Sequence, residues 1–229
     1  MSVANRLIKI QERVAAACAR AGRDPRDVHV LAVSKMQPLE KIREAASAGQ
    51  KDFAENYLQE SLPKLDALPG VNWHFIGRMQ SNKVKTIARR FAWIHSVDRP
   101  SLLRELIDAP VNIFFQFNVA EEDSKGGGDR QDVRDMLELL KMQTDAKARA
   151  QGLMVMPPLT ADAETARPHF QAAREFLREL RAGLSKAERD LHPLNALSMG
   201  TSQDFEVAIE EGANWIRIGT DVFGPRGNA

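Results

Sequence analysis

The sequence predicts an α/β fold: a single (β/α)8 barrel of the TIM type, preceded by an extra N-terminal helix. Short apolar runs alternate with longer stretches of helical spacing, which is typical of parallel strands joined by helical crossovers. About eight such units follow one another without a long linker in 229 residues, close to the roughly 250 residues of a typical barrel. The turn at 34–38 contains no glycine, so the G-x-G-x-x-G turn of open dinucleotide-binding sheets is absent.

The individual elements follow from their start and stop signals. The first helix is expected over 2–21, because Gly22 ends it, and the apolar run 28–33 is the first strand. Pro38 opens the next helix and Gly49 closes it, the usual placement of these two residues. The remaining strands are expected at 52–55, 72–76, 93–97, 111–118, 150–156, 194–198 and 215–218, and the helices at 39–48, 57–68, 82–90, 100–107, 132–142, 163–182 and 205–211.

Composition and charge exclude several classes of protein. The chain carries 32 Lys and Arg against 31 Asp and Glu, a formal net charge of +1, which argues against binding a nucleic-acid backbone. Its one cysteine, Cys18, cannot form an internal disulfide or a cysteine-rich metal site. No stretch approaches the ~18 apolar residues of a membrane span, and the N-terminus lacks a signal core. We therefore expect one cytoplasmic domain over 1–229, without a metal, nucleic-acid or membrane partner.

Lys35 stands at the carboxyl end of the first strand, where barrels place their functional residues. Alternation puts Val33 and Lys35 on one face of that strand and Ala32 and Ser34 on the other. If Lys35 faces the barrel interior, desolvation lowers the pKa of its amine, and a neutral amine attacks carbonyls to form a Schiff base. The alternative is a solvated lysine before a proline-initiated helix.

Two later strands run into loops that suit a phosphate group. The seventh strand is followed by Gly200 and Ser202, and the eighth by Gly219 and Thr220. Backbone N–H groups exposed before a helix start bind anions, and barrels most often bind phosphate in the loops after strands seven and eight. The alternative for each loop is a helix cap with a turn glycine.

Arg217 is the third candidate, because alternation points it inward with Gly219. An inward arginine needs a partner, either Glu55 in a salt bridge inside the barrel or a ring nitrogen or carboxylate of a ligand. An amine, a phosphate cup and an arginine together suit pyridoxal phosphate, which has an aldehyde, a phosphate and a ring nitrogen. A sugar phosphate held by a lysine, as in aldolases, would satisfy two of the three.

Two other groups of residues favour a structural interpretation. His74 lies in an apolar strand, so we expect it in the core. The acidic residues Glu121, Glu122 and Asp123 show no ordered ligand spacing, so we expect a solvated loop rather than a metal site.

Longer motifs are shared with a known family. They are AVSK at 32–35, FAENYLQE at 53–60, WHFIGRMQSNK at 73–83 and LSMGTSQD at 197–204, with shorter matches at 96–98, 116–118, 152–154, 216–219 and 222–224. On these motifs nearly the whole chain resembles the pyridoxal phosphate homeostasis proteins, the PROSC or YggS family. It departs from the family pattern at Ala54, Arg78 and Met79, where family members usually have glycine, many have histidine, and many have leucine, respectively.

The resemblance implies the fold of the alanine racemase barrel domain and pyridoxal 5'-phosphate held as an internal aldimine on Lys35. It implies that Ser202, Gly219 and Thr220 bind the phosphate and that Arg217 faces the pyridine nitrogen. Asn56 and Met199 would line the pocket.

The same comparison suggests a carrier rather than an efficient enzyme. Racemases that share this barrel take a second acid–base group from a tyrosine of an additional C-terminal domain of the partner subunit. This chain ends at Ala229, and its one tyrosine is Tyr57, so we expect no such group. An arginine, effectively always charged, keeps the ring nitrogen unprotonated and weakens the electron sink. We therefore expect a monomer without catalytic residues that acts in vitamin B6 homeostasis, with apoenzymes as recipients of the cofactor; the alternative is a low-activity racemase.

Overall fold

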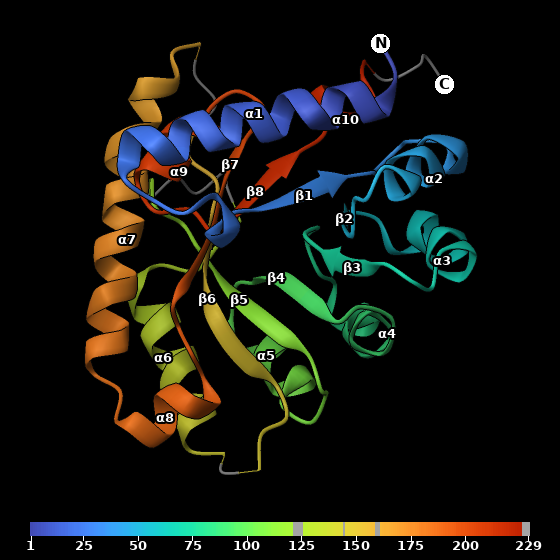
Figure 1. Cartoon of the computed structure of the whole chain (residues 1–229). Coiled ribbons are helices and arrows are strands. Elements are labelled where there is room, and N and C mark those ends of the chain that lie inside the picture. The colour runs from blue at the N-terminus through green and yellow to red at the C-terminus, as the bar shows by residue number, and fades with distance from the viewer. Residues whose placement is uncertain (121–125, 144, 159–160, 226–229) are drawn as a thin grey trace.

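The computed structural model describes residues 1–120, 126–143, 145–158 and 161–225, which form a closed barrel of eight parallel strands with helices outside it (Figure 1). The predicted fold is therefore confirmed, including the N-terminal helix. The strands are β1 His29–Val33, β2 Asp52–Glu55, β3 Asn72–Phe75, β4 Trp93–Val97, β5 Asn112–Phe117, β6 Arg149–Val155, β7 Ala196–Thr201 and β8 Trp215–Ile218. The helices are α1 Val3–Ala21, α2 Leu39–Ser47, α3 Leu58–Ala67, α4 Val84–Arg90, α5 Pro100–Leu106, α6 Arg130–Lys141, α7 Arg167–Ala182, α8 Lys186–Leu191, α9 Phe205–Glu210 and α10 Thr220–Phe223.

Several elements differ from the sequence-based expectation. Helix α6 begins two residues earlier than expected, and α7 begins four residues later, after a 3₁₀ turn over Ala163–Ala166. Strand β7 begins two residues later than expected, because Leu194 has a positive φ of 41° that no strand residue adopts. Helix α8 was not expected, although a capping box between Ser185 and Glu188 marks its start. The single turn of α10 was also missed, and it begins directly after Gly219.

The barrel closes through the pairing of the first strand with the last. Val30 lies opposite Ile216, and Leu31 opposite Arg217. Since the strands are parallel, their carboxyl ends all meet at one mouth. The residues that follow β1 and β8 are therefore neighbours in space.

Side chains fill both surfaces of the barrel wall. The inner surface carries a small buried cluster that includes Leu31, Phe114, Met154 and Trp215, whereas a larger core lies between the strands and the helices. His74 is fully buried, as expected. Cys18 lies in the larger core with no exposed surface.

Helix α1 lies across α9 and α10 (Figure 1). Ser2 caps its start by accepting a hydrogen bond from the Asn5 N–H, and its apolar side packs on the core. Arg13 forms ion pairs with Glu206 of α9 and Asp221 of α10. Helix α1 therefore holds together the two helices that begin after β7 and β8.

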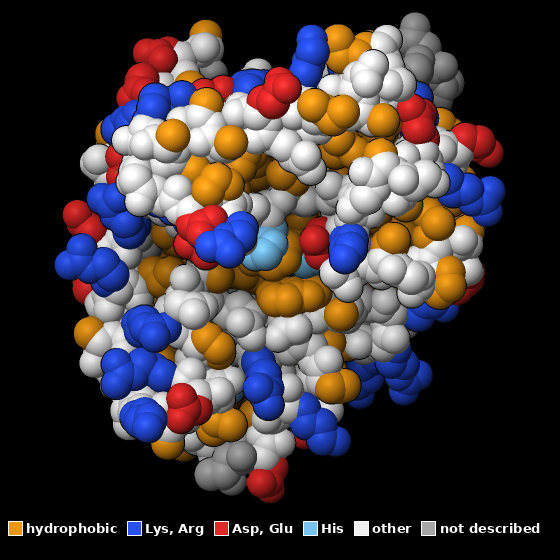
Figure 2. All heavy atoms as spheres, viewed as in Figure 1, with side chains coloured by type: hydrophobic (Ala, Val, Ile, Leu, Met, Phe, Trp, Pro, Cys, Tyr) orange, Lys and Arg blue, Asp and Glu red, His pale blue; other side chains and the backbone are white. Residues whose placement is uncertain are grey.

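On the face shown in Figure 2, basic and acidic side chains are interspersed.

Among the described residues, the structure contains no helix with the length and apolarity that a membrane crossing requires.

Strand β7 packs so closely against Gly152 of β6 that the position has no room for a side chain. A Cβ atom there would lie 1.7 Å from the carbonyl oxygen of Ala196 in β7, so the Gly152→Ala variant must push the two strands apart. We expect it to lower the free energy of unfolding by at least about 2 kcal/mol in urea denaturation. In the control Gly183→Ala the nearest atom is 3.5 Å away, and we expect a change within about 0.5 kcal/mol. Equal stability of the two variants would contradict this packing.

Candidate functional site

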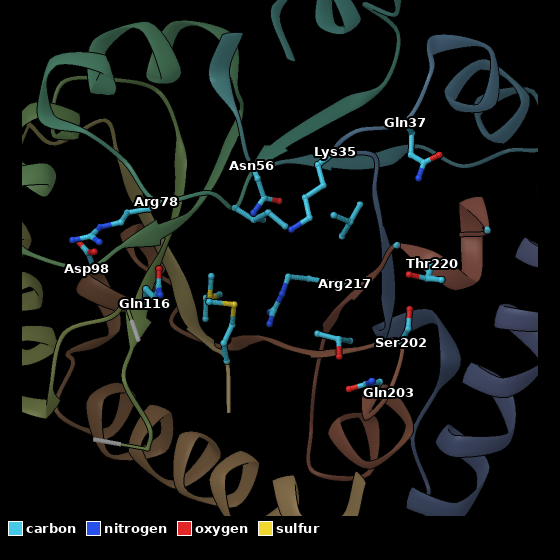
Figure 3. Close-up of a pocket in the computed structure, with 18 residues that line it drawn as sticks. Lys35, Gln37, Asn56, Arg78, Asp98, Gln116, Ser202, Gln203, Arg217 and Thr220 are labelled. Carbon is cyan, nitrogen blue, oxygen red and sulfur yellow. The ribbon is translucent and has the colours of Figure 1, made fainter. Parts of the chain in front are cut away.

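A cavity of about 590 Å³ opens at the carboxyl ends of the strands (Figure 3). Every strand of the barrel contributes residues to its wall, either from its last positions or from the loop that follows. Six of the seven residues predicted as a binding site line this cavity: Lys35, Asn56, Ser202, Arg217, Gly219 and Thr220. The seventh, Met199, is fully buried in the core outside the barrel wall and does not belong to the cavity lining.

Lys35 follows β1 and is half-buried in the cavity wall, on the same side as Val33. The alternation predicted for this strand is confirmed, because Ser34 and Ala32 are turned away from the cavity and fully buried. Figure 3 shows the Lys35 side chain reaching into the cavity toward Asn56 and Arg217. An amine in this position can reach a carbonyl group of a bound ligand.

The loops after β7 and β8 form the side of the cavity next to the loop after β1. Ser202 and Thr220 lie there close to each other (Figure 3). Asp204 shapes the first loop, because its carboxylate accepts hydrogen bonds from the Thr201 N–H at 2.6 Å and from the Thr201 hydroxyl at 2.9 Å. Thr220 begins the four-residue helix α10, in which the N–H groups of Val222 and Phe223 donate to the Gly219 carbonyl. The N–H groups of Thr220 and Asp221 come before these and have no partner within the helix. Two hydroxyls and these two N–H groups can hold an anion such as a phosphate.

Gly200 explains why the first loop can approach α9. Its φ is +90°, and a Cβ atom would lie 2.7 Å from the Cβ of Ala208 and 2.9 Å from the Cα of Phe205. A side chain at this position would therefore meet both a strained backbone and a steric clash.

Arg217 is 5 % exposed and projects from β8 into the cavity (Figure 3). Its guanidinium donates to the Ser198 carbonyl at 2.6 Å, the Ser198 hydroxyl at 3.1 Å and the Val155 carbonyl at 2.9 Å. Burial lowers the pKa of Arg217 to about 10, so the group still carries its charge at pH 7.

The salt bridge suggested between Arg217 and Glu55 is wrong. Ala54 belongs to the inner cluster of the barrel, so alternation turns Glu55 outward. There the Glu55 carboxylate pairs with Lys64 of α3 at 2.8 Å. Arg217 consequently binds neutral oxygens, and its positive charge remains available to a ligand.

A chain of hydrogen bonds continues from Arg217 through the barrel interior. His95 Nδ1 lies 2.8 Å from Ser198 Oγ, His95 Nε2 lies 3.0 Å from His74 Nδ1, and His74 Nε2 lies 3.3 Å from Asp52 Oδ1. Burial lowers the pKa of His74 and takes that of His95 well below its usual value, with His74 and Arg217 adding to the shift of His95. With both rings neutral and protonated at Nε2, each donor in this chain meets an acceptor, and Ser198 Oγ is left to accept from Arg217.

Sequence reasoning missed His95 and its link to Ser198. The available signal was period-two spacing, since His95 is two residues beyond Trp93 and both rings stack with Phe114 inside the barrel.

The rest of the cavity wall carries Arg78, Asp98 and Gln116 (Figure 3). Asp98 accepts a hydrogen bond from Arg99 at 2.7 Å. The acidic residues Glu121, Glu122 and Asp123 lie outside the described residues. Within the part of the chain that the structure describes, no group of three or more His, Cys, Asp or Glu side chains is placed to hold a metal ion.

Comparisons with known proteins agree with this geometry. Residues 6–227 match the family model described as "Alanine racemase, N-terminal domain". The chain is 43% identical to a pyridoxal phosphate homeostasis protein of Pseudomonas aeruginosa, covering 98% of this chain and 96% of that one. It is 36% identical to the pyridoxal phosphate homeostasis protein of Escherichia coli K12, with coverages of 98% and 97%.

Solved structures give the same result for the fold. PipY of Synechococcus elongatus, solved with PLP bound, is 34% identical with a TM-score of 0.79, covering 97% of this chain and 100% of that one. Alanine racemase of Corynebacterium glutamicum is 16% identical with a TM-score of 0.68, and the match covers 96% of this chain but 61% of the racemase. The second match shows a shared barrel fold.

The buried histidines predict a pH dependence of stability. In the folded chain the pKa of both His74 and His95 is lowered, whereas in the unfolded chain it returns to the ordinary histidine value of about 6.5. Below that pH the unfolded chain therefore binds more protons than the folded chain, and acid favours unfolding. Lowering the pH from 7.5 to 5.5 should therefore cost about 1 kcal/mol of unfolding free energy at His95, with a further loss at His74. The His95→Gln variant should lose less unfolding free energy on acidification than wild type, because it lacks the buried ring. A wild-type pH dependence in His95→Gln would contradict this assignment.

Proposed function

The chain belongs to the pyridoxal phosphate homeostasis proteins, within the family of the alanine racemase N-terminal domain, and from this premise we propose that it binds pyridoxal 5'-phosphate for intracellular vitamin B6 homeostasis. Its relatives of Pseudomonas and Escherichia carry that name, and the similar PipY structure holds PLP. The observation that carries the proposal is the meeting of Lys35, Arg217 and the loops of Ser202 and Thr220 in one cavity.

The residues present fit this cofactor. Lys35 would hold it covalently, Arg217 would face the ring nitrogen, and Ser202, Gly219 and Thr220 would bind the phosphate. Asn56 Oδ1 is buried in the wall with no hydrogen-bond partner among the described residues, so a ligand donor can satisfy it. When bound, the cofactor supplies an electrophilic aldehyde and an electron-accepting ring.

We further propose that the protein carries the cofactor without efficient catalysis. Racemisation needs an acid–base group on each face of the cofactor. Among the described residues, the ionisable groups of the cavity wall are Lys35, Arg78, Asp98 and Arg217, with no tyrosine, histidine or cysteine. Tyr57 is 54 % exposed and lies outside this wall. A charged Arg217 also favours an unprotonated ring nitrogen, which withdraws electrons weakly.

We also propose that the chain acts as a single domain over residues 1–229 and as a monomer. Apoenzymes that depend on pyridoxal phosphate would receive the cofactor in the cytoplasm. A low-activity amino acid racemase is the alternative, favoured by the barrel shared with alanine racemase.

The cofactor site can be tested by absorbance titration with pyridoxal phosphate. Wild type should develop the near-visible band of a lysine-bound cofactor, and Lys35→Ala should lose it because no other described lysine lines the cavity. The control Lys51→Ala changes an exposed lysine and should keep the band. An unchanged band in Lys35→Ala would overturn the site, and no band in wild type would overturn the proposed cofactor.

Carrier and racemase can be separated by proton exchange at Cα of L-alanine in D₂O, followed by NMR. Among the described residues of the cavity wall, Asp98 is the one carboxylate, and it is paired with Arg99. We therefore expect the loaded protein to exchange no more than about tenfold faster than free pyridoxal phosphate. Exchange several orders of magnitude faster, abolished by Lys35→Ala, would establish the enzyme instead.

A further inference from the structure

A buried ion cluster lies behind the loop that carries Lys35. Lys64 of α3 is 7 % exposed, and its ammonium donates to Glu55 Oε1 at 2.8 Å, Glu60 Oε1 at 2.6 Å and the Ser34 carbonyl at 2.8 Å. Glu55 has no exposed surface. The FAENYLQE motif supplies both glutamates, and no step proposed above uses them.

The cluster binds both chain neighbours of Lys35. The Ser34 hydroxyl donates to Glu55 Oε1 at 2.7 Å, and the Ser34 carbonyl accepts from Lys64. On the other side, the Met36 N–H donates to Glu60 Oε1 at 2.5 Å. The peptide units before and after Lys35 are therefore both fixed by side chains of β2 and α3.

Met36 needs this support. Its φ is +57°, a left-handed conformation that residues with a side chain adopt only when their surroundings hold them there. The Met36 side chain is 54 % exposed, so packing holds the residue weakly. Two hydrogen bonds stabilise the turn directly after Lys35: that of the Met36 N–H to Glu60, and that of the Gln37 N–H to the Ser34 carbonyl at 3.1 Å. The first is the one that a side chain supplies.

Burial of such a cluster is costly, which argues for a specific use. Removing a lysine and a carboxylate from water often costs as much as their attraction returns, and apolar side chains can fill the same volume. Burial indeed raises the pKa of the Glu55 carboxyl, although Lys64 and Ser34 oppose the shift. Glu55 Oε2 also has no partner among the described residues. The cluster is therefore a poor device for stability alone, but it fixes a backbone geometry well.

We propose that Lys64 and Glu60 are positioning residues that hold the Lys35 loop, so that the Lys35 amine meets the aldehyde of a bound cofactor. This inference rests on the proposed function, because it assumes that Lys35 attaches pyridoxal phosphate. Neither residue lines the cavity, so neither touches the ligand, and both act through Ser34 and Met36. Their loss should weaken attachment to Lys35 without weakening recognition of the ring and phosphate.

Two ligands separate these effects. Pyridoxal phosphate has the aldehyde, whereas pyridoxine 5'-phosphate has the same ring and phosphate but an alcohol in its place. In Lys64→Met we expect the affinity for pyridoxal phosphate, and the rate at which the near-visible band forms at saturation, to fall about 10- to 100-fold. The affinity for pyridoxine phosphate should stay within about twofold. The control Lys141→Met removes a lysine ion-paired on α6, away from the cavity, and should change neither ligand.

Every outcome decides the question. Wild-type affinity and rate for pyridoxal phosphate in Lys64→Met overturn the proposal, and so do equal losses for both ligands, which indicate a general structural role. If pyridoxine phosphate binds wild type too weakly to measure, the rate of band formation decides by itself. If circular dichroism shows that Lys64→Met does not fold, Glu60→Gln replaces it under the same criteria. Absence of the band in wild type is a different result, because it refutes the proposed function and not the positioning role alone.

Discussion

Pairing of β1 with β8 is the constraint on which the cavity depends. Val30 and Leu31 lie opposite Ile216 and Arg217, although these residues are far apart in the sequence. Because the paired strands are parallel, the loop with Lys35 emerges beside the loop with Thr220. A closed barrel therefore brings together an amine and a helix start, proposed to bind the phosphate, from opposite ends of the chain.

Polar side chains give this wall its chemical character. Arg217 is held by two carbonyl oxygens and by the Ser198 hydroxyl. From Ser198 a chain of hydrogen bonds continues through His95 and His74 to Asp52. Neutral histidines can satisfy every donor in this chain without adding charge to the core. The arginine thus keeps a fixed position and a positive charge that faces the cavity, and the ion pairs of α1 hold α9 and α10 together.

The sequence was most informative where one local pattern decides the outcome. Apolar runs bounded by glycine and proline gave the strands, and alternation placed Lys35 and Arg217 on the inner surface, as the structure confirms. Of the two partners considered for Arg217, Glu55 is wrong, because Ala54 faces inward and the same alternation turns Glu55 outward.

Contacts between distant segments could not be predicted in this way. The bond of His95 to Ser198 and that of Met36 to Glu60 depend on the barrel register and on the position of α3, which no local pattern encodes. Met199 is a different case, because it alternates regularly with Ser198, whose hydroxyl lies inside the barrel, and therefore packs with Leu197 in the core outside the wall.

The proposed function depends on attachment of the cofactor to one cavity lysine. Borohydride reduction of the protein loaded with pyridoxal phosphate, followed by peptide mass mapping, identifies that lysine. We expect one pyridoxyl group per chain, on the peptide that contains Lys35. A label on another lysine, or label spread over exposed lysines with none on Lys35, would contradict it.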